Sequence, residues 1–170
     1  MRIVFDEDLC EACGCCEAAC ALEHNIDLFT GDRPYRKVNV IRENGVERHL
    51  SLSCHHCERP KCARSCVFGC IKKDKNTGFV IYTHRGCTGC GRCEQACENS
   101  AIQMRLINSS YKIEKCDGCI EYIKKGEVPP CVAVCPCEAL RLIDDEERHG
   151  YENDWRDHIY KLKKYRLKKK

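Results

Sequence analysis

A chain of 170 residues is long enough for one or two small domains, and its 32% charged and 7% aromatic residues predict a modest apolar core. No run approaches the ~18 apolar residues that a membrane-spanning helix needs. The sequence has no phosphate-binding loop, GxGxxG dinucleotide fingerprint or nucleophile elbow. The composition therefore argues against a membrane span and common nucleotide-dependent enzymes, and leaves 19 cysteines and a formal net charge of +3 to be explained.

The first feature along the chain is a group of four cysteines with the spacing C-x2-C-x2-C-x3-C: Cys10, Cys13, Cys16 and Cys20. Bacterial-type ferredoxins hold 4Fe-4S clusters with this spacing, in which three thiolates bind one cube and the fourth ligates the neighbouring cluster. A helix over 17–23 would carry the fourth cysteine past the first cube. Because this first group begins so near the N-terminus, we expect no signal peptide or twin-arginine leader and a cytoplasmic chain.

A β-hairpin is predicted next. Residues 37–43 and 46–52 alternate in character around Asn44-Gly45, a pair that tolerates the positive φ angles of a two-residue turn. The second cysteine group follows with the spacing C-x2-C-x4-C-x3-C: Cys54, Cys57, Cys62 and Cys66. Four cysteines are available here, so we interpret His55 and His56 as exposed groups or cluster neighbours rather than Rieske-type ligands.

The third cysteine group repeats the spacing of the first: Cys87, Cys90, Cys93 and Cys97. A strand over 79–82 is predicted before it, because the turn residues 76–78 lead into an apolar run. A short helix over 94–98 is expected behind it. Strands over 101–107 and 111–114, joined through 108–110, should follow.

The fourth cysteine group has a wider middle gap and is followed by Pro136: Cys116, Cys119, Cys131 and Cys135. Beyond it, 146–170 is a basic tail in which four large side chains recur at helical intervals: Trp155, Ile159, Leu162 and Tyr165. Two interpretations stay open for this tail: a frayed, solvated end, or an amphipathic helix that docks on an acidic partner.

The sixteen grouped cysteines predict metal clusters in a definite number. Because such motifs work in pairs, and each pair makes a ferredoxin-like module with two cubes, four motifs predict two modules and four 4Fe-4S clusters. An oxidised cube with four thiolates carries about −2, so four would bring the net charge to about −5 and weaken any nucleic-acid interpretation. Without its clusters the chain should fold poorly.

Other uses of the cysteines are less well supported by the pattern. Paired CxxC units also bind zinc, but a tetrahedral zinc loop does not require the third closely spaced cysteine of the first and third groups. A secreted disulfide framework conflicts with the odd count and the length. Cys15, Cys70 and Cys137 are surplus, and we interpret them as small buried hydrophobic residues, with a shifted ligand assignment or a non-cubane cluster as the alternative.

Two segments make the pattern resemble a known family: CDGCIEYIKKGEVPPCVAVCP over 116–136 and CHHCERPKC over 54–62. They resemble the fourth and second motifs of the four-cluster 4Fe-4S electron-transfer subunits of the DMSO reductase superfamily and related formate dehydrogenase, hydrogenase, carbon monoxide dehydrogenase and tungsten aldehyde oxidoreductase complexes. The sequence departs from the family pattern at four positions, where Ala21, Val67 and Glu98 replace a usual proline and Tyr122 replaces a common arginine.

The resemblance implies an α+β fold of two interleaved bacterial-ferredoxin-like modules, built from short strands and helices. The outer module would be 1–36 with 108–145, and the inserted one 37–107. It also implies four ligand sets, which we number. The first set is Cys10, Cys13, Cys16 and Cys135. The second set is Cys20, Cys116, Cys119 and Cys131. The third set is Cys54, Cys57, Cys62 and Cys97, and the fourth set is Cys66, Cys87, Cys90 and Cys93.

The function implied is electron transfer without catalysis. The chain would relay electrons through four clusters between a large catalytic oxidoreductase subunit, with molybdenum or tungsten favoured, and a soluble ferredoxin or flavoprotein. The alternatives are a free-standing polyferredoxin, a partner of a nickel carbon monoxide dehydrogenase or hydrogenase, and, more remotely, a zinc scaffold. A cluster enzyme would need an open iron site, and no group is short of a cysteine.

Overall fold

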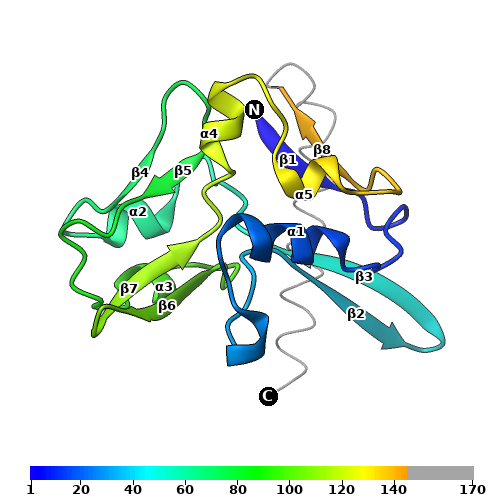
Figure 1. Ribbon diagram of the computed structural model, residues 1–170, viewed down its shortest axis with the longest axis horizontal. Coiled ribbons are helices and arrows are strands. Elements are labelled where there is room, and N and C mark those ends of the chain that lie inside the picture. Colours follow the sequence, from blue (N-terminus) through cyan, green and yellow to red (C-terminus); the bar gives the residue numbers. More distant parts are fainter. Residues whose placement is uncertain (145–170) are drawn as a thin grey trace.

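The computed structural model describes residues 1–144. The predicted basic tail and docking helix lie outside the described residues. The described chain is a small mixed fold in which short helices alternate with antiparallel strand pairs (Figure 1). The strands are β1 (Arg2–Phe5), β2 (Lys37–Glu43), β3 (Val46–Leu52), β4 (Ile71–Lys73), β5 (Val80–Tyr82), β6 (Ile102–Ile107), β7 (Ser110–Lys115) and β8 (Leu140–Ile143). The helices are α1 (Cys15–Glu23), the 3-10 turn η1 (Leu28–Thr30), α2 (Lys61–Ser65), α3 (Arg92–Gln95), α4 (Ile120–Lys124) and α5 (Pro130–Ala133).

The hairpin β2–β3 confirms the expectation from Asn44-Gly45. Its register pairs Glu43 with Val46, which leaves two residues in the turn. Asn44 and Gly45 have φ angles of 53° and 76°. Two positive φ values match the twist of the flanking strands, so the sequence sets both the turn and the register.

Other predicted elements are present with shifted boundaries. The helix expected over 17–23 begins earlier, at Cys15, directly behind Gly14 with a φ of 79°. The helix expected over 94–98 covers Arg92–Gln95 instead, because it starts directly behind the left-handed Gly91 and soon gives way to a turn. The expected strands reappear as β5, β6 and β7.

The two ends of the described chain meet in a strand pair that the sequence did not reveal. β1 pairs antiparallel with β8, from Arg2 opposite Ile143 to Phe5 opposite Leu140. Helices α1 and α5 pack beside this pair around a small core of Leu140 with two cysteine side chains. The β2–β3 hairpin joins the same group through the Val38 N–H, which donates to Glu17 Oε1 at 2.7 Å.

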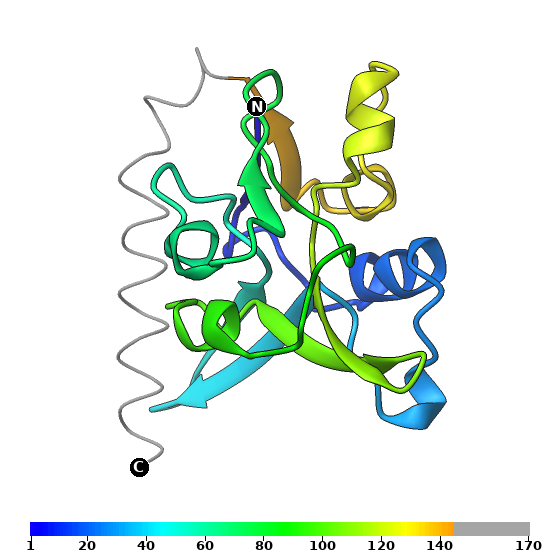
Figure 2. The ribbon, with the colours of Figure 1, turned by 90° about the vertical axis from the view of Figure 1, so that its left-hand side faces the viewer.

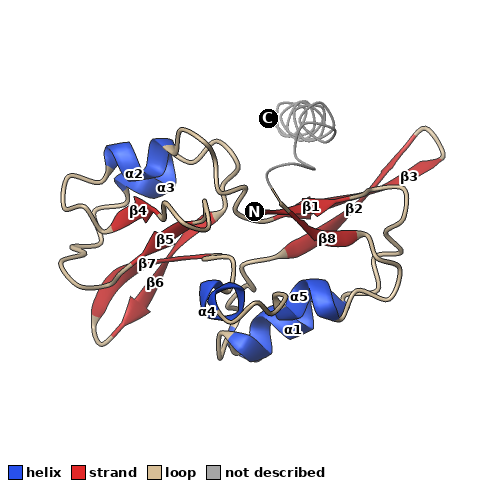
Figure 3. Ribbon diagram, turned by 90° about the horizontal axis from the view of Figure 1, so that it is seen from above, coloured by secondary structure: helices blue, strands red, loops and turns tan. Residues whose placement is uncertain are grey.

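A second group of elements combines β4–β5, β6–β7, α2 and α3. Its core is aliphatic with cysteines between the aliphatic side chains: Cys70, Ile71, Val80, Cys87, Cys93, Ile102 and Ile113. Seen from above, the two groups lie side by side, with α4 between them (Figure 3). Cysteine thiols therefore fill much of the interior of a chain whose apolar core is small.

The helices lie on two opposite sides of the molecule. Figure 2 shows α1 and α4 on one side and α2 and α3 on the other, with strands between them. Each of α1 to α5 carries a cysteine of one of the groups or directly follows one, so this arrangement distributes the thiols through the interior. Within residues 1–144, no helix is both long and apolar enough to cross a bilayer.

Candidate metal centres

The fourth cysteine of each group lies beside thiols of a different group. Cys20, from the first group, lies close enough to Cys131 for that thiol to raise the pKa of Cys20. Cys135, from the fourth group, raises the pKa of Cys10 in the same way. In the other half of the molecule, Cys97 raises the pKa of Cys62, and Cys66 raises the pKa of Cys93. Groups far apart in the sequence therefore share pockets in a crossed pattern.

The first set lies between the N-terminal loop and the end of α5. Burial raises the pKa of Cys10, and the thiols of Cys137, Cys135 and Cys13 raise it further. Burial also raises the pKa of Cys16 to about 12. Cys13 is exposed, so this pocket opens to solvent on one side.

The second set is the most enclosed of the four. Burial raises the pKa of Cys20 to about 11 and that of Cys116 to about 12, and it raises the pKa of Cys119 as well. Cys131 is only 6% exposed. Cys131 lies near enough to Cys16 of the first set to raise its pKa, and Cys54 of the third set raises the pKa of Cys116. The pocket of the second set therefore lies between those of the first and third sets.

The third and fourth sets lie around α2 and α3. Burial raises the pKa of Cys62 to about 11, and the thiols of Cys54 and Cys97 add to that shift. Burial raises the pKa of Cys93 to about 11, with Cys66 and Cys87 nearby. In the fourth set Cys90 is exposed. The crossed placements agree with the predicted ligand sets, which remain a prediction.

The loops also present backbone N–H groups to sulfur. Ala12 N–H donates to Cys10 Sγ at 3.4 Å, and Gly118 N–H donates to Cys116 Sγ at the same distance. In the inner groups the Cys70 N–H donates to Cys66 Sγ at 3.3 Å. Inward amides of this kind are what a loop around an anionic cluster requires, because they compensate charge on its sulfurs.

Three side chains beside the second set were not identified as neighbours of particular thiols from the sequence. His56 Nε2 lies 3.7 Å from Cys116 Sγ, and His24 Nε2 lies 3.7 Å from Cys119 Sγ. Arg36 is buried, and although burial lowers its pKa, the nearby thiols of Cys131, Cys116 and Cys16 raise it overall. Of the two positions offered for His56, exposed or beside a cluster, the first is wrong, because the residue is 5% exposed. No sequence spacing links these three residues to Cys116, Cys119 or Cys131.

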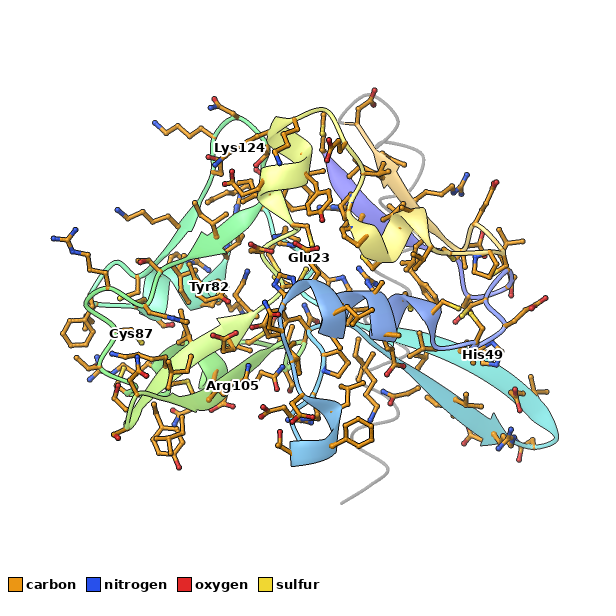
Figure 4. All side chains as sticks on the ribbon, viewed as in Figure 1. Glu23, His49, Tyr82, Cys87, Arg105 and Lys124 are labelled. Carbon is orange, nitrogen blue, oxygen red and sulfur yellow. The ribbon has the colours of Figure 1, made fainter. Side chains whose placement is uncertain are left out.

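The surplus cysteines differ from one another. Cys70 is buried, as expected, at 3% exposure. Cys15 is exposed, so the interpretation as a buried hydrophobic residue is wrong for it: it is the first residue of α1, and its side chain faces outward. Cys137 is half-buried, with its Sγ 3.9 Å from Cys135 Sγ. At the family arginine position, Tyr122 donates to Glu23 Oε2 at 2.8 Å, near the lower end of α4 in Figure 4.

The residues present suit anionic iron-sulfur clusters better than a bare metal ion. His24, Asp117 and Cys119 have ligand atoms within 4.8 Å of one another and offer a mixed site, but Cys119 also belongs to the second set. The Nε of the buried Arg36 has no hydrogen-bond partner among residues 1–144. A buried cation surrounded by thiols requires negative charge in that pocket. Thiolate-ligated cubes supply it.

Clustered thiols carried by short strands and helices define an iron-sulfur protein with a ferredoxin-like dicluster fold. A model of the 4Fe-4S dicluster domain family matches residues 46–145, more than half of the chain. The B subunit of the anaerobic dimethyl sulfoxide reductase of Escherichia coli K12 is 32% identical over 161 residues, covering 86% of this protein and 76% of the relative. The chain belongs to this family of iron-sulfur electron-transfer subunits.

Two further relatives show the range of the family. The B subunit of the anaerobic dimethyl sulfoxide reductase of Haemophilus influenzae is 34% identical over 158 residues, with 86% of this protein and 76% of the relative covered. The hydrogenase-2 operon protein HybA of Escherichia coli O157:H7 is 35% identical over 114 residues, which covers 65% of this protein and 35% of the relative. The family thus includes proteins named for two different oxidoreductase complexes.

Proposed function

We propose that this chain holds four 4Fe-4S clusters in the four ligand sets and relays electrons through them. The observation that carries the proposal is the crossed pairing, in which the fourth cysteine of every group lies with thiols of another group. That pairing is the arrangement by which two-cluster ferredoxins exchange their fourth ligands. Four crossed pockets therefore support four cubes, each able to carry one electron.

We further propose that the sets divide into two ferredoxin-like modules. The first and second sets draw on both ends of the chain, and the pairing of β1 with β8 supports treating those ends as one unit. The third and fourth sets fall within the intervening chain, where β4 to β7 form a core of their own. The β2–β3 hairpin, at the start of the proposed inserted module 37–107, also contacts the outer unit through Val38.

The protein side of the relay consists of holding and shielding the cubes. Buried thiols, inward amides and buried cations fix the ligands and set the charge around each pocket. No catalytic role is needed for the chain, which fits a non-catalytic subunit. We propose that a large catalytic oxidoreductase subunit, with molybdenum or tungsten favoured, lies at one end, and a soluble ferredoxin or flavoprotein at the other. A reducing compartment such as the cytoplasm would keep the thiols available.

The experiment that tests this is a metal and acid-labile sulfide analysis of the anaerobically purified protein in the complex it forms. We expect about 16 iron and as many sulfides per chain beyond the partner's own share. Molybdenum or tungsten in the same sample would identify the partner's chemistry, whereas nickel would favour a hydrogenase or carbon monoxide dehydrogenase. Zinc without sulfide would contradict the proposal.

A free-standing polyferredoxin is the second candidate. In the relative named putative oxidoreductase AegA the matched region is 22% of the protein, so the same module is also found as part of a longer chain. Gel filtration of the native extract, with iron measured in each fraction, distinguishes the polyferredoxin from the complex subunit. Iron that elutes at the volume of the 19.6 kDa chain alone would favour the polyferredoxin.

A further inference from the structure

The Arg36 side chain is a buried cation in the middle of the cluster pockets. It is 4% exposed, and its Nη1 donates to Ser51 Oγ at 2.6 Å. Its Nε has no hydrogen-bond partner among residues 1–144. A guanidinium cannot release its proton in a protein, so this positive charge is permanent and needs negative charge nearby.

The thiols of the second set face this cation directly. The thiol of Cys131 lies close enough to the guanidinium to raise its pKa, and the guanidinium charge lowers the pKa of Cys20 against the larger effect of burial. Cys116 also lies close enough to raise the pKa of the guanidinium. One arginine thus reaches three of the four predicted ligands of a single cluster.

His56 is a second donor beside the second set. The ring is buried, and its Nδ1 accepts the Val80 N–H at 2.9 Å. In a neutral imidazole the proton must then be on Nε2, which lies 3.7 Å from Cys116 Sγ. An edge contact with Phe79, at 4.5 Å between ring centroids, holds the ring in this orientation.

The remaining thiol of the second set also has a ring nitrogen beside it. His24 Nε2 is 3.7 Å from Cys119 Sγ, and its ring rests against Tyr35 with 4.6 Å between centroids. The fourth set differs. The donors identified beside its thiols are backbone N–H groups, among them that of Cys70, and the ammonium of Lys112 binds the Cys87 carbonyl rather than a sulfur.

We infer that Arg36 and His56, with His24, form a cationic donor pocket that holds the reduction potential of the second-set cluster above those of the other three. The inference rests on the proposed four-cluster function. Reduction adds one negative charge to a cluster, and positive charge or N–H donors at its sulfurs stabilise the reduced form more than the oxidised form. Because the second set lies between the first and third, electrons would collect in the interior of the relay.

The test is an EPR-monitored redox titration of the full chain, purified anaerobically in the complex it forms. Three variants are compared with the wild type: Arg36→Met, Arg36→Lys and Arg42→Met. Arg42 is the matched control because its side chain is 76% exposed and paired with Glu47, so its loss removes the same charge far from the buried pocket. Iron and sulfide are counted first in every sample.

In Arg36→Met the potential of one reduction step should become more negative. The expected shift is at least ~59 mV, which is a tenfold change in the equilibrium constant of a one-electron step. The other three steps should move much less, Arg36→Lys should retain most of the wild-type potential, and Arg42→Met should leave all four unchanged. The inference is overturned if no step moves more in Arg36→Met than in Arg42→Met, or if the lysine variant moves as far as the methionine variant. Fewer than four clusters in the wild type would instead contradict the proposed function.

A second measurement keeps the inference testable if Arg36→Met fails to assemble. The wild-type protein is labelled with 15N-arginine or, separately, 15N-histidine, and pulsed EPR detects nitrogen coupling to each reduced cluster. Both labels should couple to the same signal, and Arg36→Lys should lose only the arginine coupling. Absence of both couplings from every signal would overturn the inference.

Discussion

The second and fourth sets use the same four-cysteine chemistry in different surroundings. The second set is enclosed, with Cys116 and Cys131 each 6% exposed and Arg36 and His56 buried beside them. The fourth set includes the exposed Cys90, and its loop lies at one edge of the molecule, near the labelled Cys87 in Figure 4. Similar motifs can therefore give different electron carriers, because potential depends on burial, charge and donors more than on the ligands.

Removal of iron should have the largest effect, and it should erase the contrast between the two sets. Thiols occupy the cores of both halves, so the chain without clusters should lose ordered packing throughout. Anaerobic chelation followed by hydrogen exchange should show protection lost in β1–β8 and β6–β7 alike. Retained protection in either strand pair would show that half to fold without metal.

Loss of one buried ligand should separate the two sets. Cys116→Ala should lower the iron content from about 16 to about 12 and destabilise the outer unit by about 3–5 kcal/mol, since Arg36 would keep a buried charge without its partner. Cys90→Ala is the matched variant. Because Cys90 is exposed, this variant should lose less free energy of unfolding than Cys116→Ala, even if it also loses iron. Iron analysis and anaerobic urea unfolding measure both effects. Equal unfolding midpoints for the two variants would contradict the contrast.

Glycines in two of the cysteine loops give a finer contrast. Gly118 has a φ of +80°, and a Cβ there would clash with the Phe79 ring, whereas a Cβ at Gly91, with a φ of +73°, would meet open space. Gly118→Ala should therefore cost about 3 kcal/mol, from backbone strain and overpacking, and Gly91→Ala about 1 kcal/mol from strain alone. The midpoint of cluster loss in urea reports both. A similar cost at the two positions would indicate that Phe79 moves aside.

The smallest expected effect is a pH dependence at the edge of the first set. Hydrogen bonds to Glu47 and to the Cys10 carbonyl raise the pKa of His49, which Figure 4 shows on the β2–β3 hairpin. Because the folded pKa lies above the unfolded value of about 6.5, the stabilisation is complete below that pH and is lost as pH rises through the folded pKa.

His49→Gln should remove this dependence, worth about 0.5 kcal/mol because the Glu47 partner is partly exposed. The rate of chelator-driven iron loss at pH 6 and pH 8 measures it. At pH 6 the wild type should lose iron more slowly than His49→Gln, and at pH 8 this advantage should disappear. An advantage independent of pH would assign the effect to packing instead of charge.

Local signals in the sequence were sufficient for several elements. Asn44-Gly45 specified the hairpin and its register. The starts of α1 and α3 were predicted two residues too late, because the left-handed Gly14 and Gly91 that precede them were not used as start signals. The β1–β8 pair was missed because a short strand gives a weak local signal, and its partner lies at the other end of the described chain. The surplus Cys15 was misjudged because spacing does not indicate which side of a helix faces solvent.

The amino-acid sequence alone specifies the chemistry of this protein: the number of thiols, their grouping and therefore the class of cofactor. Ligand spacing is local, so it can be read along the chain. Which groups share a pocket, and which other side chains enter it, depends on the tertiary structure. Arg36, His56 and His24 reach the second set from three separate segments, and such juxtapositions arise from long-range packing that no spacing encodes.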